Sequence, residues 1–289
     1  MGQSPFVPVG QMGTVPDRPN YAAKEKNMTY KVVFLDIDGT ILMPDHRYSP
    51  MTKEAIEQLQ TQGIHTFIAT GRPLHEIKPL MDDLNIASAI GFNGAYAEIQ
   101  GETIVNNPFE KETVEEIVET AKRHEHEFVL YTNGKNYFST LDDEVTETFI
   151  ETFEMERNER FTGSHTSEVL GITVMKLQDE QFKEYEAIDQ SIHLSEVNIP
   201  GLHHAGDVIR RHVNKGEAVK KVLEVLNISE EEAIAFGDGM NDKEMMLAVG
   251  TSFAMGNAHP DLFDYATHRT TDVEDAGIYN GLKQLGIID

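Results

Sequence analysis

Residues 32–40, which read VVFLDIDGT, decide the fold class of this chain. The first four are β-branched or apolar, which is typical of a parallel strand buried on both faces. Asp36 and Asp38 follow, and Gly39 allows a turn that would let the two carboxylates converge. In an open α/β sheet the ligand site lies beyond the carboxyl ends of the strands. The stretch therefore predicts a buried strand that delivers two acidic side chains to a site.

The same order of strand, polar turn and helix continues downstream. A helix is predicted from an N-cap at Thr52 to a stop at Gly63, with an apolar face. Residues 66–69 then form a second strand, which ends at Thr70-Gly71-Arg72. Pro73 suits the first turn of another helix. Strand, helix and strand in this order predict a right-handed βαβ unit.

The pattern returns late in the chain. Residues 218–226 carry an apolar stripe at helical spacing, and Ser229 with Glu232 fits a capping box. Two further apolar runs, residues 233–236 and 252–255, read as strands. The early and late stretches together predict an α/β fold, a Rossmann-like doubly wound parallel sheet core.

An insert with a different order of predicted strands and helices separates the two halves of the core. A hairpin is predicted around Gln100-Gly101 and an amphipathic helix over residues 111–127. Further strands are predicted at 128–132, 136–140 and 171–177. The sequence thus predicts an inserted α+β cap domain.

The predicted domain boundaries follow from these patterns. The core is expected at residues 28–94 and 201–289, and the cap at 95–200. Residues 1–27 are rich in Gly, Pro and polar residues without periodicity, so we expect a flexible leader there.

Charge narrows the class of partner. The chain has 24 basic and 49 acidic residues, a net charge of -25, which disfavours nucleic acid and anionic membranes. A phosphorylated ligand therefore needs a metal ion or concentrated basic groups. Cysteine is absent, which excludes a thiolate nucleophile and suits a cytoplasmic location, and no apolar run is long enough to span a membrane.

A third strand end, residues 237–242 (GDGMND), supplies the remaining chemistry. Asp238 and Asp242 offer hard oxygen ligands suited to Mg²⁺. Lys215 is a candidate positive charge for phosphoryl oxygens. Asp36 can accept a phosphoryl group as an acyl phosphate that water later cleaves. These roles predict phosphoryl transfer.

The chain resembles the haloacid dehalogenase superfamily of phosphatases over residues 28–289. Four motifs carry the resemblance, and two shorter segments with the large insert resemble its Cof-type branch. The segments are DIDGT (36–40), TGR (70–72), NKG (214–216) and GDGMND (237–242), with NGA (93–95) and MGNA (255–258).

The resemblance implies a role for each reactive residue. Asp36 would be the nucleophile and Asp38 the general acid and base. Thr70 would hydrogen-bond the phosphoryl group, and Lys215 would offset its charge. Mg²⁺ would be held by Asp36, Asp238 and the Asp38 carbonyl.

Supporting residues are less sharply defined by the resemblance. Asp242 and Asn241 would support either the metal or the lysine. Two roles are open for Arg72, a contact with the phosphate or a structural pairing with another side chain. Asn257 would approach the site from the end of its strand. The predicted substrate-binding residues are Gly39, Gly71, Arg72, Asn241 and Asn257.

The expected activity is Mg²⁺-dependent hydrolysis of a small phosphorylated metabolite, such as a sugar phosphate or nucleotide, by a monomer or homodimer. The nearest alternative is a phosphomutase acting on a sugar phosphate. A receiver-like domain that holds a stable aspartyl-phosphate is a rival, as is a protein that binds ligand without turnover. Receivers are shorter and lack both the insert and the second aspartate, and the intact motifs argue against loss of turnover.

Overall fold

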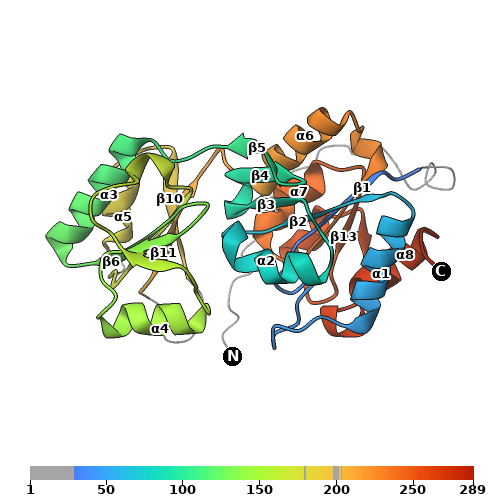
Figure 1. The fold of residues 1–289 in the computed structure, drawn as a ribbon, viewed down its shortest axis with the longest axis horizontal. Coiled ribbons are helices and arrows are strands. Elements are labelled where there is room, and N and C mark those ends of the chain that lie inside the picture. The colour runs from blue at the N-terminus through green and yellow to red at the C-terminus, as the bar shows by residue number, and fades with distance from the viewer. Residues whose placement is uncertain (1–28, 179, 198–201, 203) are drawn as a thin grey trace, which may run out of the picture.

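The computed structural model describes residues 29–178, 180–197, 202 and 204–289. The predicted leader, residues 1–27, lies outside the described residues. Two sheets lie side by side, each with its own helices (Figure 1). Across the described part of the chain, none of the helices combines the length and apolar character that a bilayer span requires.

The larger sheet forms the core and is doubly wound. Its strands run in parallel from β14 through β3, and β1 lies between β2 and β12. In sheet order they are β14 (His268–Arg269), β13 (Thr251–Ala254), β12 (Ala233–Gly237), β1 (Val32–Leu35), β2 (His65–Ala69), β3 (Ala89–Gly91), β4 (Tyr96–Ile99) and β5 (Glu102–Asn106). This topology confirms the predicted Rossmann-like α/β fold.

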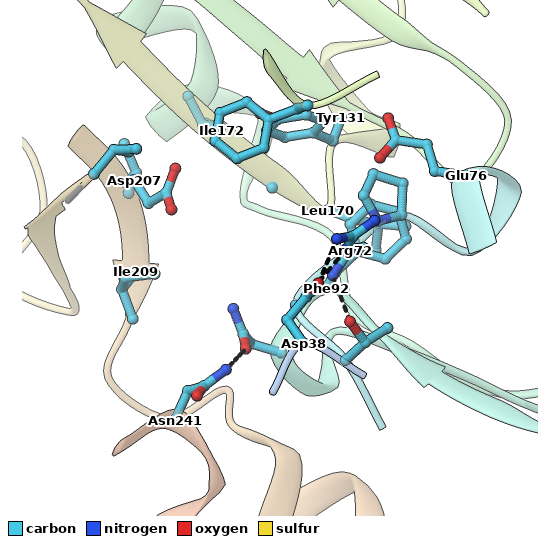
Figure 2. A pocket seen from close by; sticks show the side chains of 18 of the residues that line it. Asp38, Arg72, Glu76, Phe92, Tyr131, Leu170, Ile172, Asp207, Ile209 and Asn241 are labelled. Atoms are coloured by element: carbon cyan, nitrogen blue, oxygen red, sulfur yellow. Dashed lines mark hydrogen bonds and ion pairs between the residues drawn. The ribbon is translucent and has the colours of Figure 1, made fainter. Parts of the chain in front are cut away.

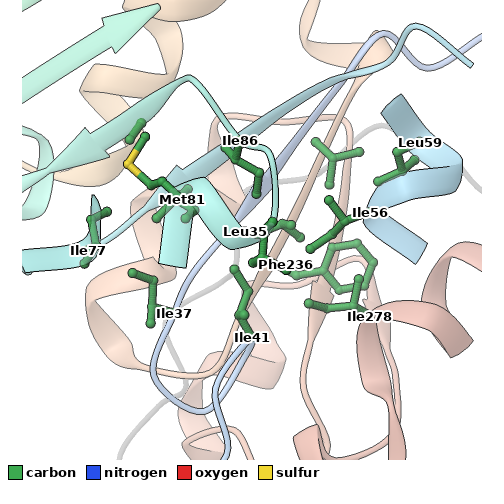
Figure 3. Packing of buried hydrophobic residues seen from close by; sticks show 14 of the residues in the cluster. Leu35, Ile37, Ile41, Ile56, Leu59, Ile77, Met81, Ile86, Phe236 and Ile278 are labelled. Atoms are coloured by element: carbon green, nitrogen blue, oxygen red, sulfur yellow. The ribbon is translucent and has the colours of Figure 1, made fainter. Parts of the chain in front are cut away.

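Helices cover both faces of the core sheet. On one face Leu35 packs with Ile56 of α1 (Pro50–Thr61) and Ile278 of α8 (Gly277–Gln284), in a cluster that also includes α2 (Leu74–Asp83) (Figure 3). On the other face Phe34 packs with residues of α6 (Lys215–Leu226) and α7 (Lys243–Leu247). Because successive side chains of a strand point to opposite faces, β1 is buried in both layers.

Two predicted helix starts differ from the structure. Ser49, not Thr52, is the N-cap of α1, and its Oγ accepts a hydrogen bond from the Thr52 N–H at 3.1 Å. Pro50 explains the earlier start, since proline suits the first turn, where its missing N–H costs nothing. Pro73 is the N-cap of α2 rather than part of its first turn. The capping box at Ser229 is confirmed, although it opens a short 3₁₀ helix.

The second sheet has six strands and its own helical layers. α3 (Lys111–His124) and α5 (Phe182–Glu186) contribute to one apolar cluster, and α4 (Glu144–Thr152) contributes to another. In sheet order the strands are β10 (Ile192–Glu196), β11 (Gly206–Arg210), β9 (Gly171–Met175), β6 (Glu127–Tyr131), β7 (Asn136–Phe138) and β8 (Asn158–Arg160). We call this sheet with its helices the cap.

Two segments join a different sheet from the one predicted. The hairpin β4–β5, expected inside the insert at 95–200, pairs with β3 and extends the core sheet. β11, which follows residue 200, pairs with β9 and β10 in the cap sheet. The alternation of a hairpin sequence does not specify the sheet edge that it joins, so the expected boundaries at 95 and 200 missed both pairings.

The chain crosses between the two sheets after β5 and again after β11. Arg210, at the end of β11, binds the first crossing: its Nη1 and Nη2 donate to the carbonyls of Pro108 and Asn107 at 2.9 and 2.7 Å. Its guanidinium also lies 4.2 Å from the centre of the Phe109 ring. Burial lowers the pKa of Arg210 to about 10. The two crossings are therefore joined by one side chain.

Candidate active site

Three acidic side chains meet at the carboxyl ends of β1 and β12. Carboxylate oxygens of Asp36, Asp238 and Asp242 all lie within 4.8 Å of one another. The pairing of Leu35 with Phe236 puts the two strand ends at the same level of the sheet. The predicted convergence of these distant segments is therefore present.

Lys215 binds two of these carboxylates. Its Nζ lies 2.6 Å from Oδ1 of Asp36 and 2.6 Å from Oδ1 of Asp242, and the side chain is fully buried. Lys215 is the first residue of α6, whose N-cap Asn214 accepts a hydrogen bond from the Glu217 N–H. A cation at a helix N-terminus is disfavoured by the helix dipole. Burial also disfavours the charge, but Asp242 and Asp36 outweigh it and raise the pKa of Lys215.

Asp242 uses both of its oxygens within the protein. Oδ1 accepts from Lys215, and Oδ2 accepts from the backbone N–H groups of Asp238 and Gly239, each at 3.0 Å. Of the two supporting roles left open for Asp242, these contacts match the one in which it holds the lysine. The prediction of Asp242 as a direct metal ligand gains no support from them.

Asp36 and Asp238 are the carboxylates best suited to a cation. Burial raises the pKa of Asp36 well above its ordinary value, Asp242 raises it further, and Lys215 opposes them. Burial, with Asp242, also raises the pKa of Asp238 to about 6. A divalent cation would offset this crowding of negative charge, and oxygen donors are the ligands that such ions prefer. The donor set therefore fits a divalent metal.

Asp38 lines the same cavity as Asp36 and Asp238 and pairs with Arg72. The Arg72 Nε donates to Asp38 Oδ2 at 2.8 Å, and Nη2 forms an ion pair with Oδ1 (Figure 2). Thr70 is buried and accepts a hydrogen bond from the Arg72 N–H at 3.1 Å. Of the two roles considered for Arg72, the structure shows the structural pairing.

Gly39 and Asn257 hold the surrounding loops. Gly39 has φ +80°, and a Cβ there would lie 2.2 Å from Oδ2 of Asp238. The amide of Asn257 donates to the Gly39 carbonyl at 2.9 Å and accepts from the Val273 N–H at 2.9 Å. Its Nδ2 lies 3.5 Å from Asp238 Oδ2, so Asn257 approaches the site as predicted, but through contacts between loops.

A cavity of about 760 Å³ opens above these residues, between the two sheets. Asp36, Thr70 and Asp238 line its core side. The other predicted residues on its wall are Asp38, Gly71, Arg72 and Asn241.

Several lining residues were not predicted from the sequence. Asn93 and Phe92 both have positive φ, and Asn93 Oδ1 accepts a hydrogen bond from Asn241 at 3.2 Å. Glu76, Tyr131 and Asp207 line the cavity toward the cap. The NGA segment marked Asn93 without assigning it a role. If residues 206–210 had been recognised as a strand, an acidic residue among apolar ones would have marked Asp207 as a candidate site residue.

Comparisons with known proteins identify the family of the chain. The haloacid dehalogenase-like hydrolase family matches residues 33–282. The putative phosphatase YkrA of Bacillus subtilis (strain 168) is 31% identical, over 90% of this chain and 100% of that protein. An HMP-PP phosphatase of Yersinia pseudotuberculosis (serotype IB, strain PB1/+) is 28% identical, over 81% of this chain and 86% of its own.

Solved structures show the same fold. A hypothetical protein from Geobacillus kaustophilus HTA426 superposes with a TM-score of 0.83 at 29% identity, covering 90% of this chain and 100% of its own. The HAD subclass IIB sugar phosphatase BT4131 gives a TM-score of 0.76 at 26% identity, covering 89% of this chain and 100% of its own.

Proposed function

The chain belongs to the haloacid dehalogenase-like hydrolases, and from this premise we propose that it is a Mg²⁺-dependent phosphatase that carries the phosphoryl group on Asp36. Relatives named as phosphatases support the class of reaction. The observation that carries the proposal is the meeting of Asp36 and Asp238 on the wall of a cavity, with the buried Lys215 Nζ 2.6 Å from Oδ1 of Asp36. A sugar phosphatase and an HMP-PP phosphatase among its relatives support a small phosphorylated metabolite as substrate.

In the first step a carboxylate oxygen of Asp36 attacks phosphorus, and the bond from phosphorus to the ester oxygen breaks. Asp38 gives a proton to that leaving oxygen, which departs as an alcohol. Asp36 and Asp238, with the Asp38 carbonyl, would hold Mg²⁺, which supplies positive charge for the phosphoryl oxygens when bound.

In the second step water attacks the phosphorus of the aspartyl-phosphate. Asp38, now ionised, takes a proton from that water, the bond between phosphorus and the Asp36 oxygen breaks, and inorganic phosphate leaves. Asp36 and Asp38 thereby return to their starting protonation states. The Arg72 ion pair would keep the carboxylate of Asp38 oriented between the steps.

Lys215 and Thr70 would act on the phosphoryl oxygens. Lys215 offers a buried positive charge beside the nucleophile, and Asp242 fixes its position. Thr70 lies buried at the end of β2 with its hydroxyl next to the Arg72 backbone. Gly71 and Asn241 would border the substrate on the cavity wall.

The replacement Asp36→Asn tests the proposal. It removes the nucleophilic charge while preserving side-chain size, so Mg²⁺-dependent phosphate release should fall at least about a thousandfold with the fold intact. Release is measured over a panel of phosphorylated metabolites, and folding by circular dichroism. Asp45→Asn is the charge-matched control, because Asp45 is exposed and pairs with the exposed Arg47, and it should remain active. Undiminished release by Asp36→Asn would refute the proposal, and isomerisation without steady release would indicate a mutase.

A further inference from the structure

One face of the cap sheet presents a row of polar side chains to the cavity. Thr173 of β9 pairs with Val129 of β6 on one side and with Asp207 of β11 on the other. Tyr131 lies two residues beyond Val129 and thus on the same face. Tyr131 and Asp207 line the cavity, and Figure 2 shows the Asp207 carboxylate directed into it.

Hydrogen bonds along this row run in one direction. The Thr173 hydroxyl donates its single proton to Oδ1 of Asp207 at 2.5 Å. Its 3.0 Å contact with the Tyr131 hydroxyl must therefore be donated by Tyr131. Burial raises the pKa of Tyr131, and Asp207 raises it further, so the phenol keeps the proton that it donates. The row consequently offers the cavity only acceptors: the Tyr131 oxygen and Oδ2 of Asp207.

Glu76 of α2 adds an acceptor from the core side. Its Oε1 accepts a hydrogen bond from Asn136 Nδ2 at 2.8 Å, and the carboxylate faces the cavity (Figure 2). Burial raises the pKa of both Glu76 and Asp207, so each carboxylate would be stabilised by a donor or a positive charge from a ligand.

The arginines on the cavity wall already have partners. Arg72 is paired with Asp38. Arg210 donates to the carbonyls of Asn107 and Pro108 and covers the Phe109 ring. A second anionic group on a ligand that reaches Asp207 and Glu76 would therefore be repelled by them, while both of these arginines are already engaged with other groups.

We infer that this acceptor wall, formed by Asp207, Tyr131 and Glu76, selects phosphate monoesters whose organic part carries hydroxyl or ammonium donors and no second anionic group. The inference rests on the proposed phosphatase function and adds the class of substrate. Ligand donors complete the hydrogen bonding of the wall, an apolar ligand leaves its acceptors unpaired, and a second anion is repelled.

Three phosphate esters with six-carbon chains test this class. Glucitol 6-phosphate carries hydroxyls, 6-phosphogluconate replaces one terminal hydroxyl carbon with a carboxylate, and hexyl phosphate has no donors on its chain. With Mg²⁺, kcat/KM for glucitol 6-phosphate should exceed that for each of the others at least about tenfold. Equal or better turnover of 6-phosphogluconate or hexyl phosphate would overturn the inference.

Variants identify the wall as the cause. Asp207→Asn replaces an acceptor oxygen with an amide that can donate, so the preference for glucitol 6-phosphate over 6-phosphogluconate should shrink about tenfold or more. Tyr131→Phe removes one acceptor and should raise KM for glucitol 6-phosphate more than it lowers kcat. Glu119→Gln, on the exposed face of α3, changes charge equally and should leave the ranking unchanged. An unchanged preference in Asp207→Asn together with an unchanged KM in Tyr131→Phe would overturn the inference.

p-Nitrophenyl phosphate separates the inference from the function beneath it. Mg²⁺-dependent release from this reporter, together with the wrong ranking of the three esters, refutes the substrate class alone. No release by the wild-type chain from the reporter or from any of the three esters would refute the phosphatase proposal, and the inference with it. The wild-type ranking gives a result even if a variant fails to fold.

Discussion

At the scale of single residues, the site depends on close approaches of backbone to carboxylate. Gly39 has φ +80°, and Asp238 lies where a Cβ would project. Glycine is the residue that allows both the left-handed backbone and the contact. Asp36, Asp242 and Lys215 are also packed closely together, since Lys215 Nζ lies 2.6 Å from an oxygen of each acid. Small changes of volume here should alter chemistry as well as stability.

Gly39→Ala separates these two effects when it is compared with Gly63→Ala. Gly63 has φ +75° but no atom within 4 Å of a Cβ, so its replacement should cost only backbone strain, about 1 kcal/mol. Gly39→Ala adds a clash with Asp238, so it should lose more stability and also require more Mg²⁺ for half-maximal activity. Urea unfolding and Mg²⁺ titration of phosphate release measure the two effects. The same Mg²⁺ requirement in both variants would contradict the clash argument.

At the scale of elements, α6 places the buried lysine because its first turn is fixed. Asn214 caps the helix, and Lys215 follows as the first helical residue. The backbone oxygen of Asn214 also lies 2.2 Å from where a Cβ on Gly94 would be, so this N-cap residue packs tightly against the loop after β3. The position of Lys215 Nζ is thus set by the N-cap residue Asn214 and by the close contact between Asn214 and Gly94.

Asn214→Ala should lower both stability and turnover, whereas Ser49→Ala should lower stability alone. Each removes an N-cap side chain, which costs about 1 kcal/mol. Only Asn214 borders a helix that begins with a site residue, because α1 carries none. Thermal unfolding and kcat/KM for p-nitrophenyl phosphate check the pair. Equal activity in the two variants would show that the α6 cap does not position Lys215.

Sequence could predict the elements that obey local rules. The run at residues 32–35 was recognisable as a buried strand because it is apolar throughout, and the polar residues that follow marked the strand ends. Sequence could not predict the contacts that depend on distant pairing. The hairpin β4–β5 joins the core sheet because β4 pairs with β3. The face of the cap sheet on which Asp207 lies is set by its pairing with Thr173. Tyr131 and Asp207 of the acceptor wall were missed because they belong to the cap, which brings them near core residues that are distant in the sequence.

At the scale of the whole molecule, the raised pKa of Asp238 in the proposed metal site links the stability of the fold to pH. The pKa of Asp238 is raised from 3.8 to about 6. Between these two pH values the folded chain therefore holds a proton on Asp238 that the unfolded chain has released. Stability contributed by this group is therefore present below its unfolded pKa and is lost as pH rises through its folded pKa. A bound divalent ion would replace the missing proton.

Mg²⁺ should consequently raise the thermal unfolding midpoint at about pH 7.5 and raise it much less at about pH 5, where protons compete for Asp238. Differential scanning calorimetry with Mg²⁺ or with EDTA measures the shifts. Asp238→Asn is the control and should show little response to Mg²⁺ at either pH. A larger Mg²⁺ shift at the lower pH would contradict the assignment of this carboxylate.

Arg210 has a mechanical consequence for the molecule. Its guanidinium binds the carbonyls of Asn107 and Pro108 in the first linker, and Arg210 itself ends the strand that leads into the second, so bending of one linker would pull on the other. Two coupled linkers behave as one hinge, which favours rotation about a single axis over twisting or sliding. The cap would then return to the same register over Asp36 after each opening, and a bound ligand would meet the same groups in every cycle.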